Sequence, residues 1–329
     1  MPGRIAAIFL WIGFATPLAA ACAGEDLRRQ LDAEVRAEIA RAVAETPYAE
    51  GNRWRAARDG RVIDILGTLH LDDPRLDAVA EAFRPTVENA DLVLIEMSPE
   101  DEAALTRSLA EDPGQLLLSG AQTLPGLMDE RDWNRVASEM RKRGIPPTMG
   151  ARMQPWYLSL QLAIPACAAE TLAAGGRGLD HRVTAIAADA GVPMRSLEDP
   201  QTLFALFSDE PPERQVRLML ASLLPQGRGE DMFATLVESY FDEAHAAGWE
   251  VSRHLAIESV DLPEAEVKAL YDDLHDEMLV ARNKAWIDII EAAPGDRLAM
   301  AFGAAHLFGR EGVLALLERE GYALSRQAF

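Results

Sequence analysis

The chain has 329 residues, of which 49% are hydrophobic, and its formal net charge is −21. This length is enough for one large α/β domain or two small ones, and no Pro/Ser/Gly-rich linker or low-complexity segment divides the chain. A negative charge of this size argues against nucleic acid and against an anionic membrane surface as partners.

The first residues have the order of a secretory signal. Arg4 precedes an apolar run at 5–15, and mostly small residues follow at 17–24. Because the run is too short for a full transmembrane helix, we expect residues 1–23 to be a signal peptide, cleaved after Ala23, and the protein to be periplasmic or secreted. No second long apolar run appears, so we expect no stable membrane insertion after cleavage.

Two alternatives for the N-terminus are an uncleaved membrane anchor and a lipoprotein anchored through Cys22. If the signal is cleaved after Ala23, Cys22 leaves with it and Cys167 stands alone. A single cysteine excludes a disulfide framework. The apolar surroundings of Cys167 (LAIPACAAE) indicate a small buried residue rather than a nucleophile.

The mature chain begins with an N-terminal helical lead-in over 24–52, where helical spacing and many charges predict an exposed helix at 25–46. Strands are expected over 53–58 and 62–66. The dipeptide between them, Asp59-Gly60, is a strong signal for a two-residue hairpin turn.

The second strand ends in the sequence Gly67-Thr68-Leu69-His70. Asp73-Pro74 then opens a helix that is expected to reach about Asn89. The near-continuous apolar run at 91–97 (DLVLIEM) predicts a strand buried on both faces, with Glu96 at its end.

The middle of the chain, about 99–290, is expected to be a large helical insertion. Helices are expected over 99–111, 130–143, 152–172, 178–190, 212–223, 229–247 and 263–292. One short strand over 192–197 interrupts them and is followed by Glu198.

The C-terminal part repeats the opening design. An apolar strand over 296–302 ends in Gly303-Ala304-Ala305-His306, and a helix over 311–320 and a strand over 322–326 follow. We therefore predict an α/β fold over 53–329, with a central mixed sheet, two strand–GxxH–helix units and the helical insertion.

The two Gly-x-x-His turns are the strongest candidate site. Ligands of open α/β sheets gather at the carboxyl ends of strands, where His70 and His306 both fall. With Glu96 they make two histidines and a carboxylate, a common open site for zinc or iron(II) that activates water. The alternative is that both histidines only cap turns. Glu96, if buried, needs a metal, a cation or hydrogen-bond donors.

Two long stretches resemble the TraB/GumN family, which includes the Tiki Wnt-inactivating proteases. They are IDILGTLHLDDPRLDAVAEAFRPTVENADLVLIEM and RNKAWIDIIEAAPGDRLAMAFGAAHLFGREGVLALLEREGYAL, and GLDHRVTAIAADAGVPMRSLEDPQ agrees more loosely. The resemblance covers about residues 53–327. It implies an α/β core whose two GxxH motifs face each other and, for Tiki-type members, a metal-dependent protease with manganese or cobalt.

The family's site residues map onto four positions of this chain. Its histidines correspond to His70 and His306, its strand-end glutamate to Glu96, and the arginine of its Arg-Asn pair to Arg282, before Asn283. Arg282 would compensate Glu96 or polarise a substrate carbonyl; without the resemblance it reads as a surface arginine on an amphipathic helix. One departure is that no aspartate follows Gly248, where the family often has a Gly-Asp pair.

Other polar residues are weaker candidates. Asp180 and Glu198 could support the site or cap a helix, whereas His181 is expected to point away from Asp180 because helical neighbours diverge. The remaining histidines (His245, His254, His275) lie on charged stretches and are expected to face solvent. The pair Trp156-Tyr157 is expected to pack in the core.

These features favour an exported metal-dependent hydrolase, a peptidase in the most concrete form, with catalytic residues Glu96 and Arg282 and a divalent ion (Mn, Co or Zn) on His70, His306 and Glu96. The partner would be a peptide or protein substrate. A non-catalytic binding protein for a peptide, a metal or a metal-bearing cofactor is the alternative, and a pure fold signature is a third. No His-Glu-x-x-His, Gly-x-Ser-x-Gly, P-loop or dinucleotide motif occurs.

Overall fold

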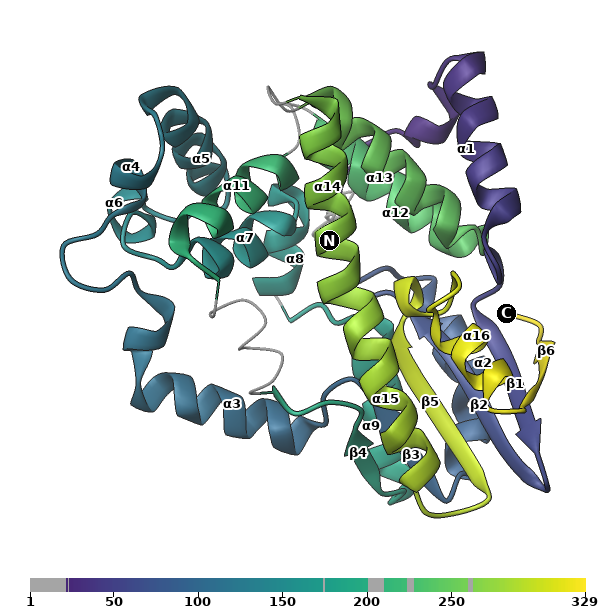
Figure 1. Cartoon of the computed structure of the whole chain (residues 1–329). Helices are drawn as coiled ribbons and strands as arrows, with labels where there is room; N and C mark the ends of the chain where they lie inside the picture. The colour runs from purple at the N-terminus through teal and green to yellow at the C-terminus, as the bar shows by residue number, and fades with distance from the viewer. Residues whose placement is uncertain (1–21, 23, 174, 201–209, 224–227, 260–262) are drawn as a thin grey trace, which may run out of the picture.

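A mixed β-sheet with helices on both faces forms the base of the molecule (Figure 1). The computed structural model describes residues 22, 24–173, 175–200, 210–223, 228–259 and 263–329. Within them the sheet has the order β4-β3-β5-β2-β1-β6. The strands are β1 (Arg53–Arg58), β2 (Arg61–Thr68), β3 (Leu92–Ile95), β4 (Met194–Ser196), β5 (Arg297–Gly303) and β6 (Ala323–Arg326).

The four strands β4, β3, β5 and β2 run parallel; β1 pairs antiparallel with β2 at one edge, and β6 pairs antiparallel with β1 outside it. The predicted hairpin joins β1 to β2, and Asp59 and Gly60 have the positive φ angles (50° and 87°) that a tight hairpin turn requires. β3 is buried at all four positions, which confirms the expectation from its unbroken apolar run. The predicted α/β class with a mixed central sheet is therefore confirmed.

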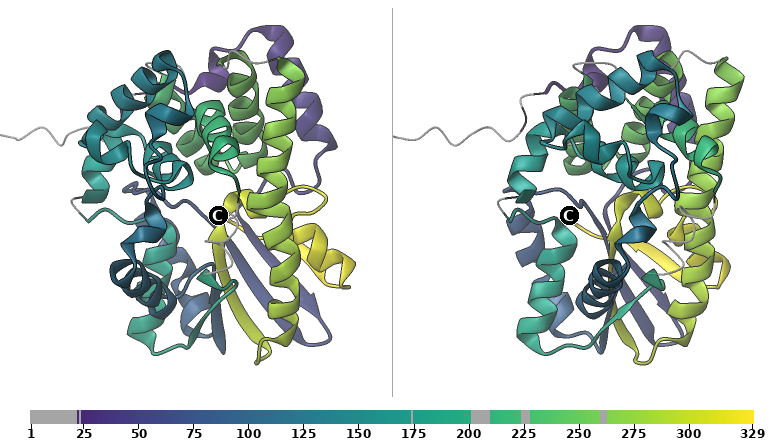
Figure 2. Two further views of the ribbon diagram at one scale, coloured as in Figure 1. Left: turned by 60° about the vertical axis from the view of Figure 1, so that its left-hand side comes forward. Right: turned by 90° about the vertical axis from the view of Figure 1, so that its left-hand side faces the viewer.

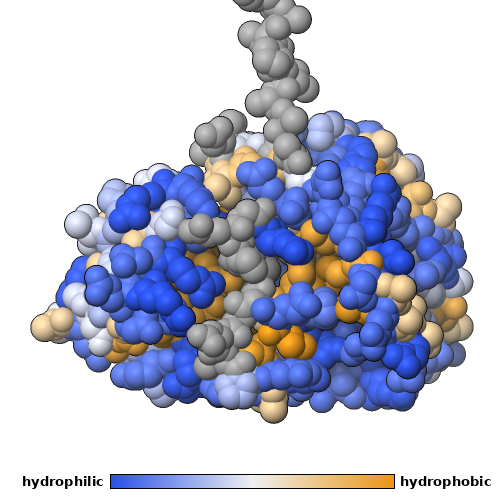
Figure 3. Space-filling view, turned by 90° about the horizontal axis from the view of Figure 1, so that it is seen from above, coloured by the Kyte–Doolittle hydropathy of each residue, from blue (hydrophilic) through white to orange (hydrophobic). Residues whose placement is uncertain are grey.

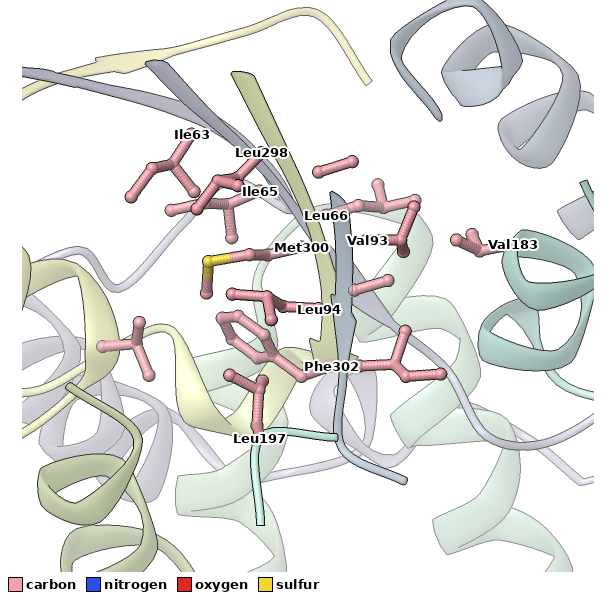
Figure 4. Close-up of a cluster of buried hydrophobic side chains, with 14 of the residues drawn as sticks. Ile63, Ile65, Leu66, Val93, Leu94, Val183, Leu197, Leu298, Met300 and Phe302 are labelled. Carbon is pink, nitrogen blue, oxygen red and sulfur yellow. The ribbon is translucent and has the colours of Figure 1, made fainter. Parts of the chain in front are cut away.

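The core fills both faces of the sheet. Helices α15 (Ala281–Ala292) and α16 (Val313–Arg319) cover one face, and α2 (Leu76–Glu88) and α9 (Leu179–Ala190) cover the other (Figure 1). Side chains alternate between the faces: Leu66 and Val93 point toward Val183 of α9, whereas Met300 and Phe302 point the opposite way (Figure 4). Burial on both faces holds the parallel strands rigidly, and so fixes the positions of their ends.

A helical region lies above the carboxyl ends of the parallel strands (Figures 1 and 2). Its helices have their own apolar cluster, built around Leu124, Val136, Met140 and Leu158. The helices of this region and its borders are α3 (Pro99–Glu111), α4 (Leu124–Leu127), α5 (Glu130–Lys142), α6 (Pro147–Gly150), α7 (Pro155–Ala163), α8 (Ala166–Ala173), α11 (Pro212–Ser222), α12 (Arg228–Phe241), α13 (His245–Ser259) and α14 (Glu264–His275).

Two of the expected helices are broken, and a third is continuous but changes its winding along its length. The helix over 152–172 divides into α7 and α8 at Pro165, because proline cannot supply the helical N–H. The helix over 229–247 ends at Phe241, and a turn with Glu243 at φ 55° separates it from α13, which the sequence did not predict as such. The helix over 263–292 contains a π-helical turn, Asp276–Val280, immediately before α15.

The N-terminal segment joins the fold. The leading helix appears as a short 3₁₀ turn (Leu27–Arg29) and α1 (Ala33–Glu45), which is exposed as expected. Most of the expected signal peptide, residues 1–21 and 23, lies outside the described residues. Cys22 forms a disulfide with Cys167, 145 residues away, so both cysteines are paired in this structure, and Cys167 would stand alone only if a cut after Ala23 removed Cys22.

The surface seen from above is mostly hydrophilic, with apolar side chains gathered in patches toward its middle (Figure 3). Among the described residues, no helix is both long and apolar enough to cross a membrane.

Candidate functional site

The ends of the four parallel strands bring together residues that are far apart in the sequence. β2 leads to His70, β3 to Glu96, β5 to Gly303 and His306, and β4 to Glu198. Because these strands are neighbours, their carboxyl ends meet along one edge of the sheet, where α/β proteins place their ligands. The two GxxH turns are adjacent, since Thr68 of β2 pairs with Gly303 of β5.

The two motif glycines are needed for close approach rather than for an unusual backbone. A Cβ at Gly67 would lie 2.5 Å from Leu307 Cδ1 and 3.1 Å from Ala304 Cα, within the second GxxH turn. A Cβ at Gly303 would lie 2.9 Å from His70 Nε2 and 3.2 Å from Glu96 Oε1. Each glycine therefore makes room for the other half of the site.

His70 is the solvent-facing member of the site, and its side chain is 58% exposed. Its Nδ1 lies 3.0 Å from Asp180 Oδ1, and its Nε2 lies 3.6 Å from Glu96 Oε1. Although much of the side chain is exposed, the protein groups packed around the ring partly desolvate it and disfavour its charge. The hydrogen bond to Asp180 and the charges of Glu96 and Asp180 outweigh this effect and raise the pKa of His70 to about 9. The imidazole is thus held by Asp180 with its Nε2 turned toward Glu96.

A glycine places Asp180 beside His70. Gly178 precedes α9, and a Cβ there would lie 2.5 Å from the carbonyl carbon of His70. The amide of Leu179 also donates to the carbonyl of Leu69 (2.9 Å). The start of α9 is therefore packed directly on the first GxxH turn, which gives the weaker candidate Asp180 a defined place in the site.

His306 is buried, at 3% exposure, and its tautomer is fixed by its neighbours. The side-chain nitrogen of Asn283 donates to the carbonyl of Glu311, so the Asn283 oxygen faces His306 Nδ1 at 2.6 Å and accepts a hydrogen bond from the Nδ1 proton. The other nitrogen, Nε2, faces Arg282 Nη1 at 3.3 Å. Burial lowers the pKa of His306 to about 3, so at neutral pH its Nε2 is unprotonated and accepts a hydrogen bond from Arg282 Nη1.

Arg282 lies at the centre of the cluster and is 8% exposed. It donates from Nε and Nη2 to the two carboxylate oxygens of Glu198 (2.8 and 2.6 Å), and from Nη2 to Glu96 Oε2 (2.7 Å). This is a bidentate pair with a second carboxylate attached. The surface arginine suggested by the helix pattern alone is therefore wrong, and Glu198 joins the site as the principal partner of Arg282.

Glu96, at the end of the buried strand β3, has both a hydrogen-bond donor and a cation beside its carboxylate. Its Oε1 accepts a hydrogen bond from the Gly303 amide (2.6 Å), and its Oε2 pairs with Arg282. Burial would raise its pKa, but the charges of His70 and Arg282 and the hydrogen bond from the Gly303 amide lower it to about 2. The carboxylate is therefore ionised and compensated by a cation and a backbone donor.

The donor types in the cluster are ones that divalent ions take, but the present contacts are not those of a metal site. Two imidazole Nε2 atoms point inward, each with its Nδ1 anchored by an oxygen acceptor, and Glu96 lies beside them; this outer anchoring is typical of metal-binding histidines. Against this, Arg282 contacts His306 Nε2, and within the described residues no three His, Cys, Asp or Glu side chains are spaced to hold an ion. An ion held by both histidines would displace that guanidinium nitrogen from His306 and the proton that the raised pKa keeps on His70 Nε2.

Sequence reasoning missed several supporting residues. Trp286, one helical turn after Arg282, stacks on His306 with ring centroids 4.4 Å apart, and Asn283 orients the same ring. His181 turns toward Asp180 rather than away, with Nδ1 2.8 Å from Oδ2. The signal that could have found them is the sequence Arg-Asn-x-x-Trp, which places three polar or aromatic groups near one face of a helix.

Outside the cluster, some residues have the environment expected from the sequence and one does not. His245 is buried and its Nδ1 contacts the Asn52 side chain (3.0 Å), so the expectation that it faces solvent is wrong. His254 and His275 are partly exposed and pair with nearby carboxylates. Trp156 is buried, and Tyr157 packs against the apolar cluster of the helical region.

Comparison with known proteins identifies the family of the chain. The chain is 20% identical over 258 residues to the uncharacterized protein YbaP of Escherichia coli strain K12, covering 78% of this chain and 88% of that protein. It is also 20% identical over 254 residues to YbaP of Shigella flexneri, covering 77% and 86%. The model of the TraB/PrgY/gumN family matches residues 52–326, which include both GxxH turns, Glu96 and Arg282, and the chain therefore belongs to the TraB/PrgY/gumN family.

Proposed function

We propose that this protein is an exported metal-dependent hydrolase that cleaves peptide bonds at the cluster of His70, Glu96, Arg282 and His306. The observation that carries the proposal is the orientation of the two imidazoles. Both have Nδ1 bound to an oxygen acceptor and Nε2 turned inward, one toward Glu96 and the other toward Arg282. Turn-capping histidines have no need of such matched anchoring, whereas ligands of a catalytic ion do.

A divalent ion would be held by His70 Nε2, His306 Nε2 and a Glu96 oxygen. Bound there, it would supply an acidified water as nucleophile and polarise a carbonyl. Softer thiolate ligands are lacking in this donor set, which suits manganese, cobalt or zinc.

The carboxylates and the guanidinium of the cluster would orient the reacting groups and stabilise the charge that develops on the substrate. Glu198 holds the Arg282 guanidinium by two hydrogen bonds, which keep the guanidinium from turning out of the site. Arg282 then stabilises the oxyanion that develops on the scissile carbonyl. Glu96 stays ionised at neutral pH and accepts a hydrogen bond from the attacking water.

The exposure of His70 to solvent favours a substrate-binding role for the cluster over a purely structural one. His70 is more than half exposed, whereas His306 and Arg282 are buried behind it. A substrate would therefore approach from the His70 side and meet the guanidinium at the base of the site.

The test is hydrolysis of a peptide library by protein exported and purified without chelator, with manganese, cobalt or zinc added in turn. Hydrolysis that is lost in Glu96→Gln, while the variant still binds the ion, supports the proposal. Glutamine keeps an acceptor for the Gly303 amide but removes the charge. His254→Ala is a matched control, because His254 is a partly exposed histidine outside the cluster and should leave hydrolysis unchanged.

Two results would overturn the proposal. The first is hydrolysis that survives in Glu96→Gln, which would place the chemistry elsewhere. The second is stoichiometric ion or peptide binding without any turnover in the unmodified protein, which would identify a binding protein instead.

A further inference from the structure

The disulfide between Cys22 and Cys167 bears on how the protein is processed. The two Cα atoms are 5.4 Å apart, within the range that a disulfide spans, and the bond closes a loop of 145 residues. Cys22 is partly buried against an apolar cluster that contains Ala168, Phe233 and Val237. The residue that a cut after Ala23 would remove is therefore part of the folded protein.

The residues that follow Cys22 are also docked. The amides of Glu25 and Leu27 donate to side chains of α12, at Asp231 (2.9 Å) and Thr235 (2.8 Å). Leu27 is 1% exposed and packs with Met232, Val251 and Leu255. A Cβ at Gly24 would lie 2.0 Å from the Glu230 carbonyl oxygen, so the backbone at Gly24 touches α12 directly. These contacts hold residues from Gly24 onward in the folded chain with either cleavage position, so the disulfide of Cys22 is the feature that distinguishes the two.

The sequence offers a second cleavage position that keeps Cys22. Signal peptidases select small residues one and three positions before the cut. A cut after Ala21 uses Ala19 and Ala21, which satisfy this rule as well as Ala21 and Ala23 do for a cut after Ala23. The first cut retains the disulfide partner of Cys167, and the second removes it.

We propose that the mature protein begins at Cys22 and that its thiol is bonded to Cys167, so the protein is released rather than lipid-anchored. Disulfide formation removes one proton and one electron from each thiol. The two electrons pass to the disulfide of a thiol oxidoreductase in the exporting compartment, which is reduced to a dithiol. A lipidated Cys22 would carry a thioether on the same sulfur, so lipidation and this disulfide exclude each other.

The bridge also lies behind the candidate site. Leu69 and Leu71, the two neighbours of His70, pack against the same apolar cluster as Cys22. The disulfide therefore supports the loop that presents His70, and this connection applies whether or not the protein is a hydrolase.

The experiment is to express the full chain with its own N-terminus in a bacterium that exports it, and to measure intact mass and thiol labelling. We expect the mass of residues 22–329, two hydrogens lighter than the reduced chain, with no label before reduction and two labels after it. Cys167→Ser should give the same N-terminus with one free thiol.

Three outcomes would overturn the proposal: a mass that begins at Gly24, a lipid adduct on Cys22, or two labelled thiols before reduction. Each is read from the unmodified protein, so a variant that fails to fold cannot obscure the result. None depends on hydrolysis, so failure here is separate from failure of the proposed function.

Discussion

Replacing each motif glycine by alanine should damage the protein in two different ways, although the motifs are alike. Neither glycine has a positive φ, and Gly303 has φ −50° and ψ 131°, which alanine adopts freely. The effects therefore come from the added methyl group and from what it meets.

Gly67→Ala places the methyl group 2.5 Å from Leu307 Cδ1 and 3.1 Å from the Ala304 backbone, where Leu307 is fully buried. Overpacking of this kind costs about 1–3 kcal/mol of stability. Gly303→Ala places it 2.9 Å from His70 Nε2, the tip of an exposed side chain that can swing outward. Its stability should change by less than about 1 kcal/mol, because the reduced entropy of the unfolded chain partly offsets the crowding.

For metal binding and hydrolysis we expect the reverse order, with Gly303→Ala the more damaging of the two substitutions. Because Gly303→Ala pushes the His70 ring away from Glu96, metal affinity and hydrolysis should fall by on the order of 10- to 100-fold. Gly67→Ala should retain the activity of whatever fraction stays folded. Urea unfolding gives the stability of both variants, and metal titration with peptide hydrolysis gives their function. A Gly303→Ala protein that binds metal as tightly as the unmodified chain would refute the role of that space.

Three further predictions concern charge. Asp180→Asn should lower the pKa of His70 from about 9 toward 6.5, measured by NMR titration of the ring proton; an unchanged pKa would exclude the Asp180 contact. Arg282→Gln should cost about 3 kcal/mol in urea unfolding, because it leaves two largely buried carboxylates without their cation, and a cost below about 1 kcal/mol would contradict the ion-pair geometry. Burial lowers the pKa of His245 to about 4, so the unfolded chain binds the extra proton as pH falls from 6.5 to 4 and stability is lost over that window. The unmodified protein should lose about 2 kcal/mol more than His245→Gln between pH 7 and pH 5, and equal losses would contradict the buried neutral ring.

Local patterns predicted the elements that carry the site. The unbroken apolar run of β3 required burial on both faces and put Glu96 at its end, and the Asp59-Gly60 turn fixed the β1–β2 hairpin. Both GxxH turns ended strands, as expected. Their adjacency in the sheet was implied by the family resemblance, and the pairing of β2 with β5 confirms it.

The contacts that join these elements could not be found in the same way. Arg282 meets Glu96 across 186 residues and Glu198 across 84, and no local pattern encodes such distances. His181 reaches Asp180 because both lie in the first turn of α9, where no preceding turn constrains the side chains. The expectation that neighbouring side chains diverge holds for the middle of a helix, and these two residues lie at its start.

Burial of polar side chains was the other source of error. His245 follows a turn that the sequence did not reveal, and its ring packs 5.2 Å from that of Phe308 near the second GxxH turn. The charged residues around it indicated exposure, but tertiary packing decided its environment.

The most direct test of the central claim is the number of metal ions bound per chain. The protein would be purified without chelator, loaded with manganese, cobalt or zinc in turn, and compared with His70→Ala and His306→Ala variants whose folding has been checked. We expect about one ion per unmodified chain and loss of that ion in both variants, because each histidine supplies one inward-facing Nε2. Absence of stoichiometric metal under all three conditions, or retention of the ion in both variants, would contradict a metal-dependent hydrolase at this site.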